Sequence, residues 1–217
     1  DGGNKEIETK NIVIATGSIP SSIPGVEISG DKIISSTEAL SLNEVPNKLV
    51  VVGGGYIGLE LGSVWSRLGS EVTVIEYLNR ITPGMDNEVS SALQKILSKQ
   101  GLNFSLNSQV ISVTEEGSNT SVVMKNRESN EEETIEADYV LISTGRKPYL
   151  ENLFNDGIDI QKTDAGFLKT DSHLRTNIDG IWAIGDVVEG PMLAHKAEEE
   201  GIAVAELIAG KPGHVNY

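Results

Sequence analysis

The sequence predicts an α/β fold organised around residues 49–76, and three observations support this prediction. Residues 49–52 are apolar and mostly β-branched, as in a buried parallel strand. Glycines at 53, 55 and 58 follow at once with G-x-G-x-x-G spacing. Apolar residues then recur at helical spacing up to Gly69, and a second strand at 72–75 ends on Glu76. This order of elements predicts a Rossmann-like unit that binds a dinucleotide.

The glycine spacing has a chemical explanation. Gly53 allows a tight turn, Gly55 lets a pyrophosphate approach the backbone, and Gly58 lets helix and strand pack closely. The pyrophosphate would meet the free N–H groups and the positive end of the helix. Glu76 lies where a carboxylate can bind the adenosine ribose and repel a 2′-phosphate, so NAD is favoured over NADP. Arg80, just beyond, is a base that could accommodate such a phosphate.

Composition limits the class of protein. The 217 residues can form one large domain or two small ones, and 38% hydrophobic residues fit a soluble globular chain. The net charge of −15 argues against partners made of nucleic acid and against an anionic membrane surface. No apolar run is long enough to span a membrane. The chain has no cysteine, which excludes a disulfide scaffold and a thiolate metal site.

Before the nucleotide unit, we expect a polar turn at 1–5, a strand at 11–15 and a linker at 18–30, which is rich in Pro and Gly. Residues 36–40 predict a short capped helix. Within the unit, the apolar residues expected to form the buried face of the first helix are Ile57, Leu61, Val64, Trp65 and Leu68.

After Glu76, residues 79–83 predict a loop and Asp86 caps a helix at 87–100 that Gly101 ends. The apolar stripe expected on this helix is Val89, Leu93, Ile96 and Leu97. Strands are expected at 109–114, 120–125 and 138–143, with a turn near Gly117. The acidic hexad at 128–133 is expected to be a solvated hairpin tip and not a metal site.

From Pro148 onward the pattern indicates a third region. A strand is expected at 167–170, and a buried strand at 180–186 ends on a Gly-Asp turn. A final helix is expected at 192–209, with small residues on the face that packs against a backbone. Its run Glu198-Glu199-Glu200 is expected to be a solvated face.

Residues 7–17 are echoed by residues 135–145 at a fixed offset of 128, and Pro20 is echoed by Pro148. Each copy is a strand that runs into a Thr-Gly turn. The second copy closes the nucleotide unit, whereas the first has no glycine fingerprint before it. We therefore expect residues 1–17 to be the tail of a further nucleotide domain that precedes them. The alternative is two unrelated segments that share common residues.

Together these features resemble the flavin-dependent pyridine nucleotide–disulfide oxidoreductases, and among them the dihydrolipoamide dehydrogenases. The resemblance covers the whole chain and is most specific at 192–201. It implies a C-terminal tail of an FAD domain at 1–17, an NAD-binding domain with an inserted β-meander at 18–145, and a smaller α+β, FAD-contacting central domain at 146–217. The motifs that carry it are residues 15–17, 53–60, 144–148, 183–186 and 192–201.

The resemblance also implies roles for single residues. The residues expected to bind NAD are Gly53, Gly54, Gly55, Tyr56, Ile57, Gly58, Glu60, Glu76, Val110 and Gly145. Among them Glu60 would lie by the nicotinamide and Tyr56 would act as a gate near the flavin. The residues expected to touch FAD are Thr16, Gly17, Ser18, Asp186, Met192, Leu193, Ala194 and His195. Asp186 would accept a hydrogen bond from the ribityl chain of FAD. No catalytic residue and no metal ligand is expected among these 217 residues.

Without the motifs around them, three of these residues have simpler explanations. Glu60 would be an acid that interacts with the helix dipole. Asp186 would be a turn residue, and His195 an ordinary surface or packed histidine.

The activity implied is oxidation of dihydrolipoyl groups through a disulfide and FAD, with reduction of NAD. The implied partners are 2-oxoacid dehydrogenase or glycine-cleavage complexes, in a bacterial cytoplasm or mitochondrial matrix, with a homodimeric parent and no nucleic acid or membrane. The disulfide, the flavin fingerprint and the interface domain would lie outside this chain, so we expect it to be inactive alone. The alternatives are another NAD(P)H-dependent flavin disulfide or peroxide reductase, and a stand-alone, non-catalytic NAD-binding module.

Overall fold

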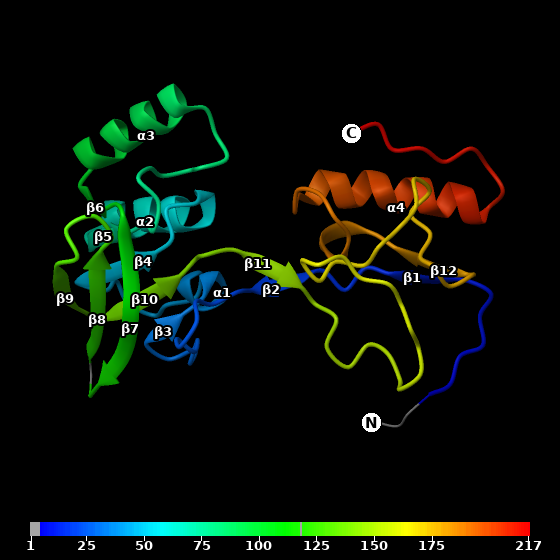
Figure 1. Cartoon of the computed structure of the whole chain (residues 1–217), viewed down its shortest axis with the longest axis horizontal. Coiled ribbons are helices and arrows are strands. Elements are labelled where there is room, and N and C mark those ends of the chain that lie inside the picture. The colour runs from blue at the N-terminus through cyan, green and yellow to red at the C-terminus, as the bar shows by residue number, and fades with distance from the viewer. Residues whose placement is uncertain (1–4, 118) are drawn as a thin grey trace. The chain divides into compact units, whose positions relative to one another are not determined.

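The computed structural model describes residues 5–117 and 119–217 (Figure 1). These residues divide into two compact units: residues 20–145 form one, and residues 5–19 with 146–217 form the other. Helices and a parallel sheet occur together, so the predicted α/β class is confirmed. Four of the five residues of the polar turn expected at 1–5 lie outside the described residues. Ser118, next to the turn expected near Gly117, lies outside them as well.

A five-stranded parallel sheet forms the centre of residues 20–145 (Figure 1). Its core strands are nearly all apolar because both of their faces are covered. The strands at 49–52, 72–75 and 138–143 were predicted, whereas the two edge strands were not. The strand order is β3 (Ile33–Ile34), β10 (Tyr139–Ile142), β4 (Lys48–Val52), β5 (Glu71–Ile75) and β6 (Leu102–Ser105).

Alternate residues of the sheet enter two different cores, as the strand period of two requires. On one face Leu49 and Val51 pack with helix residues such as Leu59 and Trp65. On the other face Val50 joins a second core, together with residues of the β-meander described below.

Helix α2 (Tyr56–Leu68) ends at the predicted glycine, and α3 (Asn87–Lys99) begins where it was predicted and ends one residue before the predicted position 100. Gly69 closes α2 with a left-handed φ of 118°, and the Asp86 side chain accepts from the Glu88 N–H at 2.8 Å. The predicted apolar faces are partly wrong. The residues of α2 that are buried are Gly58, Leu59, Gly62 and Trp65, while Val64 and Leu68 are exposed, as are Val89 and Ile96 of α3.

The reason lies in the glycines of α2. A Cβ on Gly62 would lie 3.3 Å from Cγ1 of Val72, so the helix backbone lies directly against the sheet. A hydrophobicity pattern gives no weight to glycine and therefore places the contact on the wrong face.

The short capped helix was predicted, and α1 (Ser36–Ala39) is held by a capping box in which Ser35 is the cap. The Ser35 N–H and hydroxyl donate to the Glu38 carboxylate at 2.8 and 2.6 Å. The hydroxyl bond is the main cause that holds the pKa of Glu38 below its ordinary value of 4.5, and burial opposes it.

A Glu38→Gln variant should therefore show a pH-dependent loss of stability. Because the carboxyl pKa is lowered on folding, the stabilisation is complete above pH 4.5 and is lost as the pH falls through the lower, folded-state pKa. Urea unfolding in a Trp182→Phe background, followed through the fluorescence of Trp65, should show a difference in stability between the chains with and without Glu38→Gln at pH 7 that shrinks toward pH 3. A difference that stays constant with pH would contradict this assignment.

Three antiparallel strands form the β-meander: β7 (Ser108–Glu116), β8 (Asn119–Asn126) and β9 (Glu132–Ala137). Val113, Val122 and Met124 of this sheet pack in the same core as Val50. The acidic hexad is only partly a hairpin tip, since Glu132 and Glu133 already pair in β9 with Lys125 and Met124.

In the other unit, β1 (Ile12–Ile14) pairs in parallel with β12 (Ile181–Ala183), and β2 (Ser18–Pro20) pairs with β11 (Arg146–Pro148). The predicted linker at 18–30 therefore starts as a strand. The sequence echo has a structural counterpart, because β2 and β11 lie at the same offset of 128 residues and pair with each other. The strand expected at 167–170 is reduced to single bridges of Leu168 with Lys162 and Val188.

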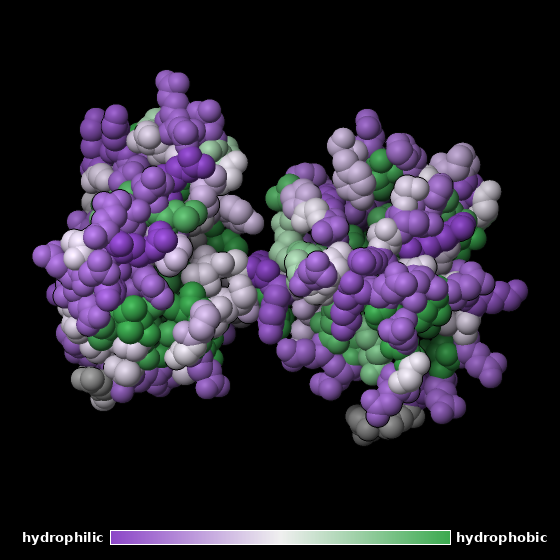
Figure 2. Space-filling model, viewed as in Figure 1, coloured by the Kyte–Doolittle hydropathy of each residue, from purple (hydrophilic) through white to green (hydrophobic). Residues whose placement is uncertain are grey.

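The strand β12 leads into the 3-10 turn η1 (Gly185–Val187), against which helix α4 (Ala194–Ile208) packs. The helix starts at Ala194 rather than 192. The expectation of a solvated Glu198-Glu199-Glu200 face is wrong for Glu200, which is fully buried. Among the described residues no helix is long and apolar enough to cross a membrane, and the visible surface of each unit is mostly hydrophilic (Figure 2).

Candidate functional site

The glycine turn lies at the carboxyl end of β4, between β10 on one side and β5 on the other. The Gly53 N–H donates to the Ile75 carbonyl at 2.9 Å, and the Gly54 carbonyl accepts from the Thr82 N–H at 2.8 Å. The chain runs from β4 outward through β5 to β6, while β10 returns on the opposite side of β4. In open parallel sheets, ligands bind outside the carboxyl ends of the strands at such a reversal of strand order.

Packing within the chain explains three of the four glycines at this turn. A Cβ on Gly53 would lie 2.6 Å from the Ser143 carbonyl oxygen, and one on Gly58 would lie 2.5 Å from the Gly53 carbonyl oxygen. A Cβ on Gly54 would lie 3.1 Å from Oε2 of Glu76. Gly55 differs, since its φ of −79° suits any residue and a Cβ there would meet nothing within 4 Å. The bare backbone at Gly55 thus leaves room for a ligand in front of α2.

Glu76 is fixed beside this turn and is only 8% exposed. Its Oε2 accepts from the Gly54 N–H at 2.6 Å and its Oε1 accepts from the Leu78 N–H at 2.8 Å. An ionised carboxylate offers about four acceptor positions, so two remain for hydroxyl groups of a ligand.

The remaining residues expected to bind NAD lie in the same unit but at greater exposure. Tyr56 is 62% exposed at the first residue of α2, next to the half-buried Ile57, and Glu60 is exposed one turn further on. Val110 is half-buried in β7, beside a bulge. Gly145 is exposed and has a φ of 132°, in the region that favours glycine.

Sequence reasoning missed Ser143. Its hydroxyl lies 3.0 Å from the Val52 carbonyl and 3.2 Å from the Gly53 carbonyl, so it ties the end of β10 to the glycine turn. The echo carried a signal for it, because the first copy has Ala15 at the corresponding position.

A second feature that the sequence did not indicate lies just beyond Glu76. The Arg127 guanidinium lies 3.8 Å above the Tyr77 ring and donates to the Tyr77 carbonyl at 3.1 Å. Arg80, which could have accommodated a 2′-phosphate, donates to the Pro83 carbonyl of its own loop at 2.8 Å.

In the other unit, several residues expected to touch FAD meet at the carboxyl ends of β1 and β12. The Ser18 hydroxyl donates to Oδ2 of Asp186 at 2.5 Å, across 168 positions of sequence. The Thr16 hydroxyl donates to the Tyr149 carbonyl at 2.6 Å, and Gly17 has a φ of 73°. These residues meet because parallel pairing aligns β1 with β12.

Arg146 completes this group and was not assigned a role from the sequence. Its Nε donates to the Ser18 hydroxyl at 2.7 Å and its Nη2 to the Ser18 carbonyl at 2.6 Å. A fixed guanidinium therefore orients the hydroxyl that holds Asp186.

The segment at 192–195 lies at the start of α4. Leu193 and His195 line a cavity of about 560 Å³, together with Lys196 and Tyr217, whereas Met192 and Ala194 do not line it. Leu193 is the N-cap and makes no side-chain capping bond. Neither Ser18 nor Asp186 is among the residues that line this cavity.

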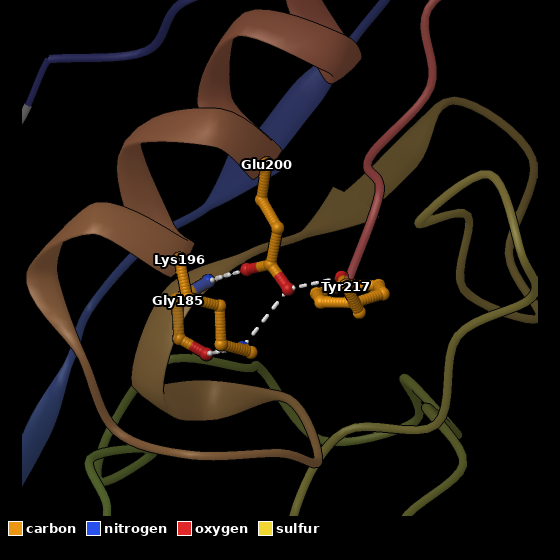
Figure 3. A network of polar contacts seen from close by, with 4 residues as sticks. All are labelled: Gly185, Lys196, Glu200 and Tyr217. Carbon is orange, nitrogen blue, oxygen red and sulfur yellow. Dashed lines mark hydrogen bonds and ion pairs between the residues drawn. The ribbon is translucent and has the colours of Figure 1, made fainter.

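Lys196 and Glu200 are buried on α4, and the sequence gave no indication of this (Figure 3). Their charged groups are 2.9 Å apart, and the Tyr217 hydroxyl donates to Oε1 of Glu200 at 2.6 Å. Burial of that hydroxyl and its bond to Glu200 raise the pKa of Tyr217 well above its usual range, although most of the residue is exposed. Within the described residues no cluster of acidic and histidine side chains could hold a metal ion.

A parallel sheet with a glycine turn and a fixed acid at its carboxyl edge places this protein among the α/β proteins. The chain belongs to the pyridine nucleotide-disulphide oxidoreductase family, whose sequence pattern matches residues 1–201. The family resemblance inferred from the motifs is therefore confirmed.

Several similar curated proteins are dihydrolipoyl dehydrogenases. The chain is 51% identical to dihydrolipoyl dehydrogenase 3 of Pseudomonas putida over 217 residues and 52% identical to the mitochondrial dihydrolipoyl dehydrogenase of Dictyostelium discoideum over 219. It is also 49% identical to a leghemoglobin reductase of Vigna unguiculata. In each case the whole chain is covered, but only 46, 45 and 42% of the relative.

Two solved structures have the same fold. The HOCl-induced flavoprotein disulfide reductase RclA from Escherichia coli, as a Cu(II) complex, matches 98% of the chain with a TM-score of 0.87 and 30% identity. LpdA from Mycobacterium tuberculosis matches 100% with a TM-score of 0.87 and 27% identity. The chain covers 47 and 46% of these two proteins.

Proposed function

We propose that this chain is the NAD-binding and central part of a flavin-dependent dihydrolipoyl dehydrogenase. Residues 20–145 would be a Rossmann-like NAD domain with the β-meander inserted before its last strand. The observation that carries the proposal is the open space at Gly55, directly beside the fixed carboxylate of Glu76. Six relatives named dihydrolipoyl or dihydrolipoamide dehydrogenase are 48–52% identical to the chain, which supports this activity.

In this proposal the chain's own residues bind and orient two cofactors. The free N–H groups of the first turn of α2 would hold the NAD pyrophosphate, and Glu76 would accept from the ribose hydroxyls. Asp186, held by Ser18 through Oδ2, would accept from a ribityl hydroxyl of FAD through Oδ1. Bound FAD would supply hydride transfer to the nicotinamide of NAD. Glu60 would lie beside the nicotinamide, and Tyr56 would lie near the flavin.

The rest of the activity depends on groups outside these residues. The chain has no cysteine, so the redox-active disulfide of such an enzyme would lie elsewhere. Dihydrolipoyl groups of 2-oxoacid dehydrogenase or glycine-cleavage complexes would be the substrate, and the enzyme would be a homodimer. A bacterial cytoplasm or a mitochondrial matrix would suit it, and the Dictyostelium relative is named as mitochondrial.

Substitution of two glycines by alanine tests the NAD site. Gly55→Ala adds a methyl group in open space, so it should cost less than about 1 kcal/mol of stability but lower NADH affinity at least about tenfold, or about 1.4 kcal/mol. Gly58→Ala should instead destabilise the unit by about 1–3 kcal/mol, because the methyl group meets backbone. Calorimetric titration with NADH and urea unfolding measure the two effects.

Gly84→Ala is the matched control, since a Cβ there also meets nothing within 4 Å and Gly84 lies in a loop outside the glycine turn. It should leave both stability and NADH affinity almost unchanged. If Gly55→Ala binds NADH as tightly as Gly84→Ala does, the proposed pyrophosphate position is wrong.

A further inference from the structure

Gly185 is held through both of its backbone polar groups by two side chains of α4 (Figure 3). Its N–H donates to Oε2 of Glu200 at 2.6 Å, and its carbonyl accepts from Nζ of Lys196 at 3.1 Å. The first bond fixes the peptide before Gly185 and the second fixes the peptide that leads into Asp186. The Gly185 carbonyl also accepts from the Val188 N–H at 3.2 Å within the turn, so the two charged side chains add to this local bond and help to fix the direction in which the chain leaves β12.

Stability alone gives little reason for a charged pair at this place. Glu200 is fully buried and Lys196 is 6% exposed, and a buried ion pair is often no more stabilising than apolar residues of similar volume. An apolar pair, however, could form neither bond to Gly185. What these two residues add is a fixed orientation of the backbone at Gly185. This glycine has a φ of 73°, and a glycine backbone without such contacts can adopt many other conformations.

We propose that Lys196 and Glu200 are positioning residues for the carboxylate of Asp186. They act through Gly185, while the Ser18 hydroxyl, which Arg146 orients, holds the carboxylate itself. This inference rests on the proposed role of Asp186 as a ligand of the FAD ribityl group. A carboxylate that accepts a hydrogen bond from a ligand hydroxyl binds better when its position is fixed. The contacts of Lys196 and Glu200 restrict the backbone next to Asp186, and the contact of Ser18 restricts its side chain.

The test uses the flavin-free chain, so that it does not depend on FAD binding. Glycine and alanine are labelled with ¹⁵N, and aspartate with ¹³C at the carboxyl carbon. The readouts are amide hydrogen exchange of Gly185, relative to that of Ala183 in the same unit, and the Asp186 carboxyl chemical shift. Ala183 is a suitable reference because its N–H donates to the Leu174 carbonyl and to no side chain of α4.

The main variant is Lys196→Met with Glu200→Met, which removes both bonds and leaves no unpaired charge. We expect Gly185 exchange to rise at least about tenfold relative to Ala183, and the Asp186 resonance to move. Lys196→Arg keeps a donor and should stay close to wild type. Glu198→Gln, which changes the charge of an exposed residue of the same helix, should change neither readout.

Two further variants separate the possible outcomes. Exchanging the charges (Lys196→Glu with Glu200→Lys) keeps an ion pair but neither bond to Gly185. It should therefore show the same faster Gly185 exchange and the same movement of the Asp186 resonance, and it provides the test if the double methionine variant folds poorly. Ser18→Ala should move the Asp186 resonance without changing Gly185 exchange. Exchange at Gly185 that rises no more than at Ala183, or an Asp186 resonance that does not move, would overturn the inference. Failure of Asp186 to bind FAD would leave these readouts unchanged and would refute only the proposed function.

Discussion

Replacement of Glu76 by arginine is expected to lower NADH affinity at least about a hundred-fold and to reverse the preference over NADPH. The carboxylate accepts from the Gly54 and Leu78 N–H groups, and it would accept from the ribose hydroxyls. Hydrogen bonds to charged groups contribute about 1.5–3 kcal/mol each, and about 1.4 kcal/mol is a tenfold change in affinity. An arginine in this place would also attract the 2′-phosphate that a carboxylate repels.

Calorimetric titration with NADH and NADPH measures this effect. Glu71→Arg makes the same change of charge at the other end of β5, where the side chain is exposed and pairs only weakly with Lys48 at 4.0 Å. It should bind NADH as wild type does. A Glu76→Arg variant that still prefers NADH would show that another residue selects the cofactor.

Replacement of Lys196 by methionine alone is expected to destabilise its unit by about 3–5 kcal/mol, because it leaves the Glu200 carboxylate buried without a cation. Adding Glu200→Met should restore most of the loss, since two apolar side chains of similar size leave no buried charge. The large single effect and the small double effect together identify a coupled, buried pair.

Tryptophan fluorescence during urea unfolding can follow this unit alone. The chain has two tryptophans, and Trp182 packs with Val204 of α4 whereas Trp65 belongs to the other unit. A Trp65→Phe background therefore reports on Trp182. If the double variant is as unstable as Lys196→Met, the burial of charge is not the cause of the loss.

Local rules were enough to predict much of this structure. The apolar run at 49–52, the glycine turn and Asp86 each act through neighbours in sequence, by strand pattern, backbone freedom and capping. The corresponding strand, turn and helix start all lie where they were expected. The combination of short motifs was also specific enough to indicate the family.

Where distant contacts decide the outcome, the sequence pattern was not sufficient. Glu198, Glu199 and Glu200 are identical side chains in a row, yet only Glu200 is buried, because the rotation of α4 about its axis turns that position toward Gly185. Ser143 and Arg146 act on groups 90 and 128 positions away. In α2 the buried face follows Gly58 and Gly62, which carry no hydrophobic signal.

The sequence by itself therefore determined the strand, glycine turn, helix and second strand at 49–76 with its acid, and membership in the oxidoreductase family. Only the tertiary structure decided which glycine faces open space, which glutamate is buried, and which residues hold Asp186. Hydrophobic periodicity and capping depend on residues a few positions apart. Burial and hydrogen-bond partners depend instead on how elements pack after the chain has folded.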